Sequence, residues 1–285
     1  MAAAIAWIDG PDGEGHWGEP AALGLPLHDR GLLLADGLFE TLLVERGQPQ
    51  LLKEHLERWH GGAALLGMAA PPGAALVHQL AAEAVARSGI GDGALRLNWS
   101  RGGGGRGIEP PPVGPEGSPG QRFWLQLSAA TPCFDPLTVI VSATERRCST
   151  SLLSRCKSFA YGSAIQARRQ ARAAGADDAL LVSSAGGLCC GTTANLLVLR
   201  AGQWCTPPLA SGCLPGVMRR RALELGLAQE AQQPIELSEL ASGQIRAALL
   251  INSLGCRPIS AIEGLALAEV QPGAAERFWR GLLPA

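Results

Sequence analysis

The chain has 285 residues, of which 47% are hydrophobic and 17% are charged, and its formal net charge at pH 7 is −1. A chain of this length can bury a sizeable core and is expected to form two domains. The balanced charge argues against a protein that binds nucleic acid or an anionic membrane surface. No apolar run is long enough to span a bilayer, so we expect no membrane segment.

The N-terminus and the cysteines indicate a cytoplasmic protein. Residues 1–7 are apolar but lack the basic start of a signal peptide, and residues 1–10 predict a strand. The eight cysteines show neither a C-x-x-C motif nor zinc-ligand spacing. Without a secretion signal, they are expected to be reduced thiols that fill small apolar spaces. We therefore assign no disulfide and no metal.

Hydrophobic periodicity predicts a mixed first half that ends in a linker. A Gly/Pro-rich turn region at 11–26 precedes most of these elements, and residues 46–49 form a hairpin-type turn. A glycine-rich and then proline-rich stretch from 100 to 120 predicts a long loop, which lacks the G-K-[ST] of a P-loop. The expected elements are strands at 1–10, 38–44, 94–99 and 122–128, and helices at 53–67 and 74–87.

The second half also mixes strands with helices, which makes the fold class α/β (α+β). Two prolines within 129–136 mark a linker. The expected domains are therefore a small N-terminal α/β domain at 1–128 and a larger C-terminal domain at 137–285. The expected elements of the second domain are strands at 137–143, 178–183, 194–199 and 247–252, and helices at 162–174, 215–226 and near the C-terminus.

Lys157 is the first candidate for chemistry. The chain has few lysines, and this one lies beside Phe159 and Tyr161, just before a predicted helix. Partial desolvation lowers the pKa of a lysine and makes a neutral amine available for Schiff-base chemistry. A surface lysine at a helix start is the alternative, because most lysines are exposed.

Several stretches, taken in order along nearly the whole chain, carry a family resemblance. They are D-R-G at 29–31 with A-D-G-L-F-E-T at 35–41, E-H-L-E-R-W at 54–59, and the stretches at 157–166, 174–181, 191–197, 206–209, 213–219 and 251–254. Together they resemble the class IV fold of pyridoxal-phosphate enzymes, which includes branched-chain and D-amino-acid aminotransferases and 4-amino-4-deoxychorismate lyase. The resemblance implies a small N-terminal α/β domain, a larger C-terminal domain with a barrel-like sheet, pyridoxal 5'-phosphate between them, and a homodimer.

The resemblance also implies roles for individual residues. Lys157 is the Schiff-base lysine and the proton-transfer base. Arg58 binds the phosphate, because a guanidinium suits a phosphate dianion, and Tyr161 contacts the phenolic oxygen of the cofactor. An arginine on a solvated helix face and a tyrosine in the core are the respective alternatives.

Further phosphate contacts are expected in the second half. Val217 and Met218 follow Pro215 at a helix start, where backbone N–H groups and the helix dipole favour a phosphate. Asn252 falls where the family supplies another phosphate contact. A simple helix cap and a turn-forming asparagine are the alternatives.

Cys190 is where the chain departs from the family. Counting back from Asn195, the family has a glutamate at this position, under the pyridine nitrogen of the cofactor. A carboxylate there keeps that nitrogen protonated and makes the ring a strong electron sink. A thiol holds the proton less well, so we expect a weaker sink. A shifted register or another acid in its place are the alternatives.

The loop at 100–107, S-R-G-G-G-G-R-G, looks most like that of aminodeoxychorismate lyases. By this resemblance Arg106 binds a substrate carboxylate, and Phe39 also contacts substrate. A flexible linker with scattered arginines is the alternative for this loop. Ile108 replaces the substrate histidine of the D-amino-acid transaminases. The resemblance therefore favours a lyase that converts 4-amino-4-deoxychorismate to 4-aminobenzoate and pyruvate.

Two rivals remain open at this point. One is a class IV aminotransferase that acts on branched-chain or D-amino acids, which Glu40 in F-E-T fits at least as well. The other is a pyridoxal-phosphate-binding paralogue without catalytic activity, which Cys190 makes credible.

Overall fold

The computed structural model of the chain describes residues 3–10, 14–104, 107–110, 120–268 and 270–284. The chain divides into two compact units. The first comprises Met1–Thr131 and Cys156–Ala160, and the second comprises Pro132–Arg155 and Tyr161–Ala285. The first change of unit falls inside the expected linker at 129–136. The short segment 156–160 belongs to the first unit, although it lies within the range 137–285.

The first unit contains a six-stranded antiparallel sheet with the strand order β2-β1-β6-β5-β3-β4. Its strands are β1 (Ile5–Asp9), β2 (Gly15–Gly18), β3 (Gly37–Glu45), β4 (Gln48–Pro49), β5 (Gly93–Ser100) and β6 (Arg122–Ala129). The strands expected at 38–44, 94–99 and 122–128 are confirmed. The interpretation of 11–26 as a turn region alone was wrong, because β2 pairs with β1 there and places Trp17 opposite Trp7. Four residues flanked by glycine are too few to show alternation.

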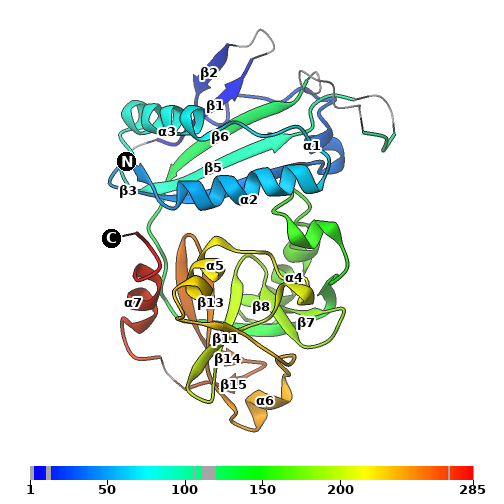
Figure 1. Ribbon diagram of the computed structural model, residues 1–285, viewed down its shortest axis with the longest axis vertical. Helices are drawn as coiled ribbons and strands as arrows, with labels where there is room; N and C mark the ends of the chain where they lie inside the picture. The colour runs from blue at the N-terminus through cyan, green and yellow to red at the C-terminus, as the bar shows by residue number, and fades with distance from the viewer. Residues whose placement is uncertain (1–2, 11–13, 105–106, 111–119, 269, 285) are drawn as a thin grey trace. The chain divides into compact units, whose positions relative to one another are not determined.

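Three helices accompany this sheet: α1 (Arg30–Leu34), α2 (Leu52–Leu65) and α3 (Ala74–Ser88). Both α2 and α3 pack on the sheet (Figure 1), as the periodicity of 53–67 and 74–87 predicts. Helix α3 ends at Gly89, whose φ of 71° is left-handed. No periodic signal in the sequence predicts α1, a five-residue helix capped by the Asp29 side chain.

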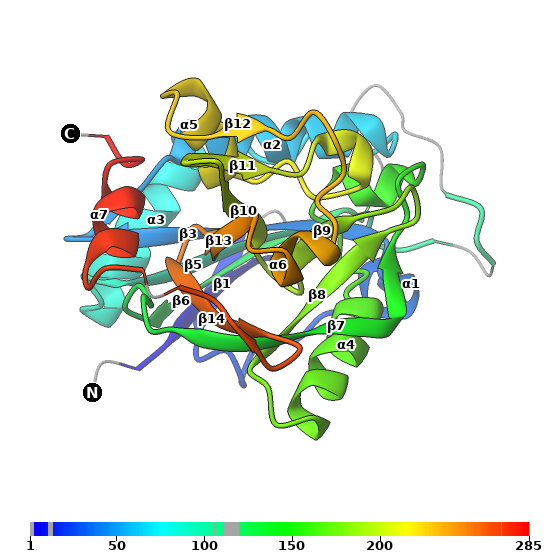
Figure 2. The same cartoon turned by 90° about the horizontal axis from the view of Figure 1, so that it is seen from below.

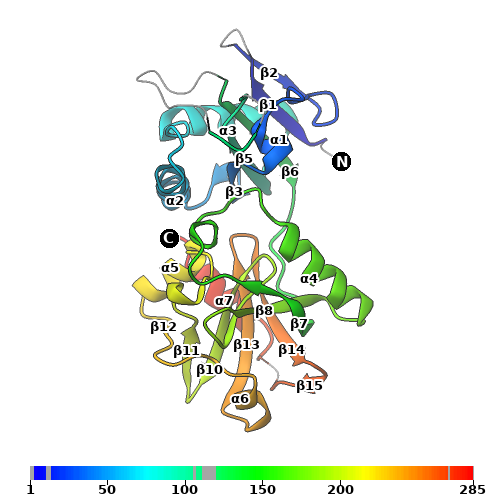
Figure 3. The ribbon, with the colours of Figure 1, turned by 90° about the vertical axis from the view of Figure 1, so that its right-hand side faces the viewer.

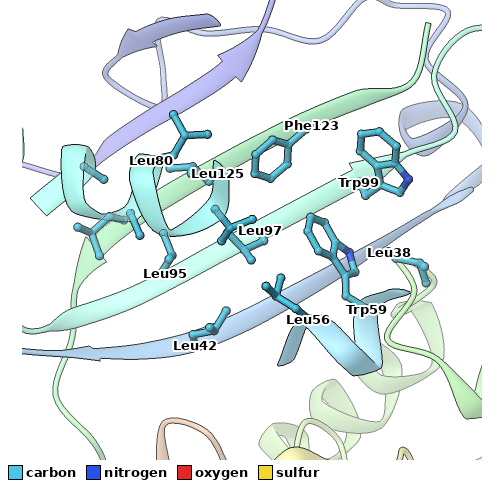
Figure 4. Packing of buried hydrophobic residues seen from close by; sticks show 14 of the residues in the cluster. Leu38, Leu42, Leu56, Trp59, Leu80, Leu95, Leu97, Trp99, Phe123 and Leu125 are labelled. Atoms are coloured by element: carbon cyan, nitrogen blue, oxygen red, sulfur yellow. The ribbon is translucent and has the colours of Figure 1, made fainter. Parts of the chain in front are cut away.

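The core of the first unit lies between the sheet and the helices α2 and α3. Figure 4 shows Leu56 and Trp59 of α2 packed against residues of β3, β5 and β6, and Trp59 is 1% exposed. Burying a side chain of this kind contributes about 1.5–3 kcal/mol. Large apolar residues at alternate strand positions therefore fix which face of the sheet is buried.

The second unit is built on a nine-stranded sheet that closes on itself. Strand β9 pairs with both β8 and β10, so the strands β10, β13, β14, β7, β8 and β9 form a closed ring, with labelled members visible in Figure 2. This ring is the barrel-like sheet expected for the larger domain. The strands are β7 (Leu137–Arg147), β8 (Asp178–Ser183), β9 (Leu188–Gly191), β10 (Asn195–Arg200), β11 (Gln203–Thr206), β12 (Gln229–Glu230), β13 (Ile245–Asn252), β14 (Gly255–Ile262) and β15 (Leu265–Ala266).

Helices surround this barrel, and α4 packs on β7 and β8 (Figure 3). The helices are η1 (Leu152–Arg155), α4 (Gly162–Ala173), η2 (Leu209–Ser211), α5 (Val217–Glu224), α6 (Ser238–Ala241) and α7 (Ala274–Arg280). The helix expected at 215–226 is confirmed in a shorter form, because Pro215 and Gly216 precede its first turn. Within the described part of the chain, no helix is both long and apolar enough to cross a membrane.

The eight cysteines all lie among the described residues, where none of them forms a disulfide and six are buried. Hydrogen bonding with Cys190, together with burial, raises the pKa of Cys189 to about 12. Burial alone raises the pKa of Cys256 to about 12. Both side chains are therefore neutral thiols at pH 7, which agrees with their interpretation as small apolar fillers.

Candidate active site

The segment that carries Lys157 belongs to the first unit, where it pairs with the start of β3. The amide of Phe39 donates to the carbonyl oxygen of Lys157 at 2.9 Å, and the amide of Phe159 donates to that of Gly37 at 2.9 Å. An isolated antiparallel bridge joins the residues between these pairs. Because side chains alternate along an extended segment, Lys157 and Phe159 lie on the same face as Phe39.

The amine of Lys157 lies over an aromatic ring that also holds a guanidinium. The Nζ atom is 4.3 Å from the ring centroid of Phe39, and Cζ of Arg96 is 3.7 Å from the same centroid. A cation near the face of a ring is attracted by its quadrupole. Asn98 orients Arg96, because its Oδ1 accepts from Nε of Arg96 at 2.8 Å. A guanidinium and an amine beside one apolar ring can hold an anionic group next to an apolar one.

Glu40 is the centre of a buried charged cluster on the opposite side of β3. One carboxylate oxygen accepts from Nε of Arg58 at 2.9 Å, and the other contacts Nδ1 of His55 at 2.7 Å. A second guanidinium nitrogen of Arg58 also bonds this carboxylate. Side chains of Glu40 and His55 are each 1% exposed, and that of Arg58 is 11% exposed.

Burial and the neighbouring charges shift the pKa values of Glu40 and His55 in opposite directions. Burial raises the pKa of Glu40, but the charge of Arg58 and the hydrogen bonds from His55 and Arg58 outweigh it and lower the pKa to about 2. Burial lowers the pKa of His55 below 6.5, against the opposing effect of Glu40. At pH 7, Glu40 is therefore ionised and His55 is neutral, with its Nδ1–H donating to Glu40.

In the second unit, Asn195 joins the segments that carry several expected site residues. It lies opposite Cys190 in the β9–β10 pairing, and its Nδ2 donates to the carbonyl of Leu214 at 2.9 Å. A Cβ atom on Gly216 would lie 1.9 Å from Oδ1 of Asn195, so the turn before α5 requires glycine at this position. This role of Asn195 was missed, because nothing in the sequence pattern around it indicates a contact with the segment at 214–216.

The turn leads into a helix N-terminus without a side-chain cap. Gly216 is the N-cap residue of α5 and makes no side-chain hydrogen bond to the first turn. Val217 and Met218, the first two helical residues, are buried. Their N–H groups lie in the first turn of the helix, where backbone donors lack intrahelical partners.

Cys190 lies in an apolar cluster, and Asp178 lies beside Gly191, the next residue in the chain. Cys190 belongs to a cluster of small and apolar side chains that includes Cys189, Cys213, Ala179 and Leu181. Asp178 Oδ2 would be 3.5 Å from a Cβ atom on Gly191. One oxygen of Asp178 accepts from the Thr192 hydroxyl at 2.6 Å, and the other pairs with Arg168 at 2.8 Å. Asp178 is thus already occupied by partners of its own.

The predicted site residues fall into two groups. Phe39, Arg58 and Lys157 lie in the first unit, where Phe39 and Lys157 are in contact, while Arg58 bonds Glu40. Arg106 lies outside the described residues. The others belong to the second unit: Tyr161, Cys190, Val217, Met218 and Asn252.

Within that second group, most positions are linked. Asn195 connects Cys190 to the turn before Val217 and Met218, and Nδ2 of Asn252 donates to the carbonyl of Thr193 at 3.4 Å. Tyr161 is the N-cap residue of α4 and is partly exposed. Arg96 was missed, because a single cation in an alternating strand usually faces solvent.

Residues 37–262 match the family model described as amino-transferase class IV. The chain therefore belongs to the class IV aminotransferases, which are pyridoxal-phosphate enzymes. The match covers the strand β3, the Lys157 segment and the whole closed ring of the second unit.

Relatives within this family carry more than one activity in their names. The chain is 29% identical to the 4-amino-4-deoxychorismate lyase of Pseudomonas aeruginosa, whose structure gives a TM-score of 0.76 and 97% coverage of both chains. A fold IV transaminase of Curtobacterium pusillum gives 25% identity, a TM-score of 0.80, and 99% coverage of this chain and 97% of that one. A protein of Methanocaldococcus jannaschii, provisionally named a branched-chain-amino-acid aminotransferase, is 27% identical over 217 residues, 74% of each chain.

The residues of the chain fit the cofactor of this family. The uncapped N-terminus of α5 offers backbone donors of the kind that bind phosphate. The glycine at 216 lets the Asn195 side chain pack against the turn and hold the start of the helix in place. In the first unit, Lys157 supplies a primary amine held beside an apolar ring.

Proposed function

We propose that the chain is a pyridoxal-phosphate-dependent lyase that converts 4-amino-4-deoxychorismate to 4-aminobenzoate and pyruvate. Its similarity to the Pseudomonas aeruginosa lyase over 97% of both chains carries this proposal. The loop S-R-G-G-G-G-R-G at 100–107 supports it by resemblance. The chain is further proposed to act as a cytoplasmic homodimer.

We assign the cofactor to the residues that the family resemblance names. Lys157 would hold it covalently, and Val217 and Met218 would bind its phosphate with Arg58 and Asn252. Tyr161 would contact the phenolic oxygen, and Cys190 would lie under the ring nitrogen. When bound, pyridoxal 5'-phosphate supplies a carbonyl that condenses with amines and a conjugated ring that withdraws electrons from the amine-bearing carbon.

Lys157 would then act as the base of the reaction. Its neutral amine accepts the proton from the amine-bearing carbon of the substrate, and the C–O bond to the enolpyruvyl group breaks. The enolate that departs with the C–O electron pair would take up one proton at its methylene carbon, in balance with the proton that Lys157 removes, to become pyruvate, while the ring that remains is the aromatic 4-aminobenzoate. Arg106 and Phe39 would orient the substrate, with the carboxylate paired to the arginine.

The sequence makes a direct test of Lys157 practical. The chain has only two lysines, Lys53 and Lys157, and the side chain of Lys53 is 84% exposed on α2. In the Lys53→Arg variant, Lys157 is the one side-chain amine that remains. Borohydride reduction in the presence of pyridoxal 5'-phosphate should place the pyridoxyl group on Lys157, as found by peptide mass mapping.

Substitution of the same lysine completes the test. Lys157→Ala should abolish turnover, because it removes both the covalent anchor and the base. Lys53→Arg is the matched control and should keep full activity. A pyridoxyl group found on Lys53 in the wild-type chain, with Lys157 unmodified, would refute the site assignment.

The second candidate function is an aminotransferase of branched-chain or D-amino acids. The similarity to the Curtobacterium pusillum transaminase favours it. Glu40 favours neither function, because it is committed to Arg58 and His55 inside the first unit. Incubation of the purified protein with 4-amino-4-deoxychorismate, and separately with an amino acid and a 2-oxo acid, distinguishes the two.

A non-catalytic paralogue is the third candidate, and Cys190 is the observation in its favour. The absorbance spectrum of the purified protein with pyridoxal 5'-phosphate shows whether the cofactor binds. Binding without either turnover would support the paralogue and contradict both enzymatic proposals.

A further inference from the structure

Phe159 occupies a slot that two glycines of the first unit leave open. A Cβ atom on Gly37 would lie 2.2 Å from Cε2 of Phe159, and one on Gly31 would lie 3.0 Å from the same atom. Distances under 3.0 Å are not compatible with a real side chain, so Gly37 cannot carry one while the ring stays in place. The ring of Trp124 is 5.7 Å away between centroids and that of Phe39 is 6.3 Å away.

The same ring belongs to the segment that carries the reactive lysine. Phe159 is two residues after Lys157, and hydrogen bonds to β3 at both residues fix the register of the segment. On the other face, Cys156 is 4% exposed and packs in the core of the first unit. A Cβ atom on Gly62 of α2 would lie 3.2 Å from Cβ of Cys156. The lysine is therefore flanked by one anchor on each face of the sheet.

We propose that Phe159 is a positioning residue for Lys157, and that the slot formed by Gly31, Gly37 and Trp124 holds the lysine amine over Phe39. This inference rests on the proposed function, since it takes Lys157 as the reacting amine. Phe159 does not itself act on the substrate. Its ring determines where the segment lies, and the segment determines where Nζ lies relative to the ring of Phe39.

Two substitutions perturb the slot from opposite sides. Phe159→Ala empties it, whereas Gly37→Ala fills it and displaces an intact Phe159. Gly61→Ala is the matched control, because a Cβ atom on Gly61 of α2 meets nothing within 4 Å. Phe159→Leu is the conservative variant, which keeps an apolar side chain in the slot. All variants are made in the Lys53→Arg background, so that Lys157 is the only lysine.

Two amine reactions of the full chain are then compared by intact mass and peptide mapping. One is reductive trapping of pyridoxal 5'-phosphate, and the other is reductive methylation with formaldehyde. If Phe159 positions the lysine, trapping at Lys157 slows by at least about tenfold in Phe159→Ala and Gly37→Ala, because a small misplacement of a reacting group is costly. Methylation of the same amine becomes faster, because the released side chain is more accessible. Phe159→Leu partly restores trapping, and Gly61→Ala behaves as the parent does.

The two readouts separate the outcomes. If Phe159 contributes to stability alone, Phe159→Ala lowers the unfolding midpoint but leaves the trapping and methylation rates of the folded protein unchanged. That result would overturn the proposal. Unchanged trapping in Gly37→Ala would overturn it even if Phe159→Ala fails to fold. If the parent itself shows no trapping at Lys157, the proposed function fails. Methylation still tests the anchoring in that case, and equal methylation rates in all variants would reject it.

Discussion

The buried cluster around Glu40 allows a quantitative prediction for Glu40→Gln. The substitution keeps the shape of the side chain but removes the charge that faces Arg58 and His55. The pKa of Glu40 falls from 4.5 to about 2 in the folded protein, and every tenfold change in an acid dissociation constant corresponds to about 1.4 kcal/mol. Ionised Glu40 therefore contributes about 3 kcal/mol to the free energy of unfolding at pH 7.

The sign of the pH dependence follows from the direction in which the pKa moves. Because the folded pKa is depressed, the contribution is fully present above the unfolded pKa and is lost as the pH falls towards about 2. Urea unfolding of the wild type and Glu40→Gln should show a difference of about 3 kcal/mol at pH 7, and about half of it near pH 3. Burial lowers the pKa of His55 from 6.5. Both proteins therefore lose further stability as the pH falls below 6.5, where His55 is protonated in the unfolded chain.

Glu83→Gln is the matched control for this experiment. Glu83 is paired with Arg87 four residues later in α3, where the two side chains are 35% and 49% exposed. Such exposed pairs contribute between 0 and about 1 kcal/mol. If Glu40→Gln is no less stable than Glu83→Gln at pH 7, or if the difference stays constant down to pH 3, the electrostatic account of the cluster is refuted.

Three further outcomes are expected. Arg58→Ala should weaken the affinity for pyridoxal 5'-phosphate more than it lowers turnover at saturating cofactor, because a phosphate contact acts equally in ground and transition states; slower turnover with unchanged affinity would contradict this. Cys190→Glu should raise aminotransferase activity by a larger factor than lyase activity, because formation of an aromatic ring lets elimination proceed with a weaker electron sink. Both activities are assayed at saturating cofactor, and equal factors would show that Cys190 is not under the ring nitrogen. Gly216→Ala should cost about 1–3 kcal/mol in urea unfolding through overlap with Asn195. Gly162→Ala is the control, because its Cβ atom would meet nothing within 4 Å; it should be neutral or stabilising by up to about 1 kcal/mol. Equal changes in the free energy of unfolding of the two variants would mean that the turn accommodates the added methyl group without cost.

The long amphipathic elements could be predicted because their signal is local. Apolar residues at helical spacing on α2 and alternating residues on β5 are each contained within a few turns or one strand. Short strands such as β9, whose sequence is L-C-C-G, carry no alternation and were missed. Closure of the ring could not be derived from periodicity either, because it depends on pairing β14 with β7, which is more than a hundred residues earlier.

The site was predictable only in part for a similar reason. Lys157 stands out as a lone lysine beside aromatic residues, and its contact with Phe39 places both on one face. Glu40 appeared as part of a motif, yet its partners depend on how α2 is rotated against β3, which no local pattern specifies. Asn195 and Arg96 gave no signal, because one asparagine or one arginine within a strand is ordinary.

The crossing of residues 156–160 into the first unit has a consequence for the order in which the chain can fold during synthesis. A ribosome that has released only the first 131 residues has not yet made the segment that pairs with the start of β3. The amide of Phe39, the carbonyl of Gly37 and the slot above Gly31 then stay without their native partners. The first unit therefore matures only after part of the second has emerged, and a gene split at residue 131 would yield two fragments of which neither holds the Lys157 segment in place.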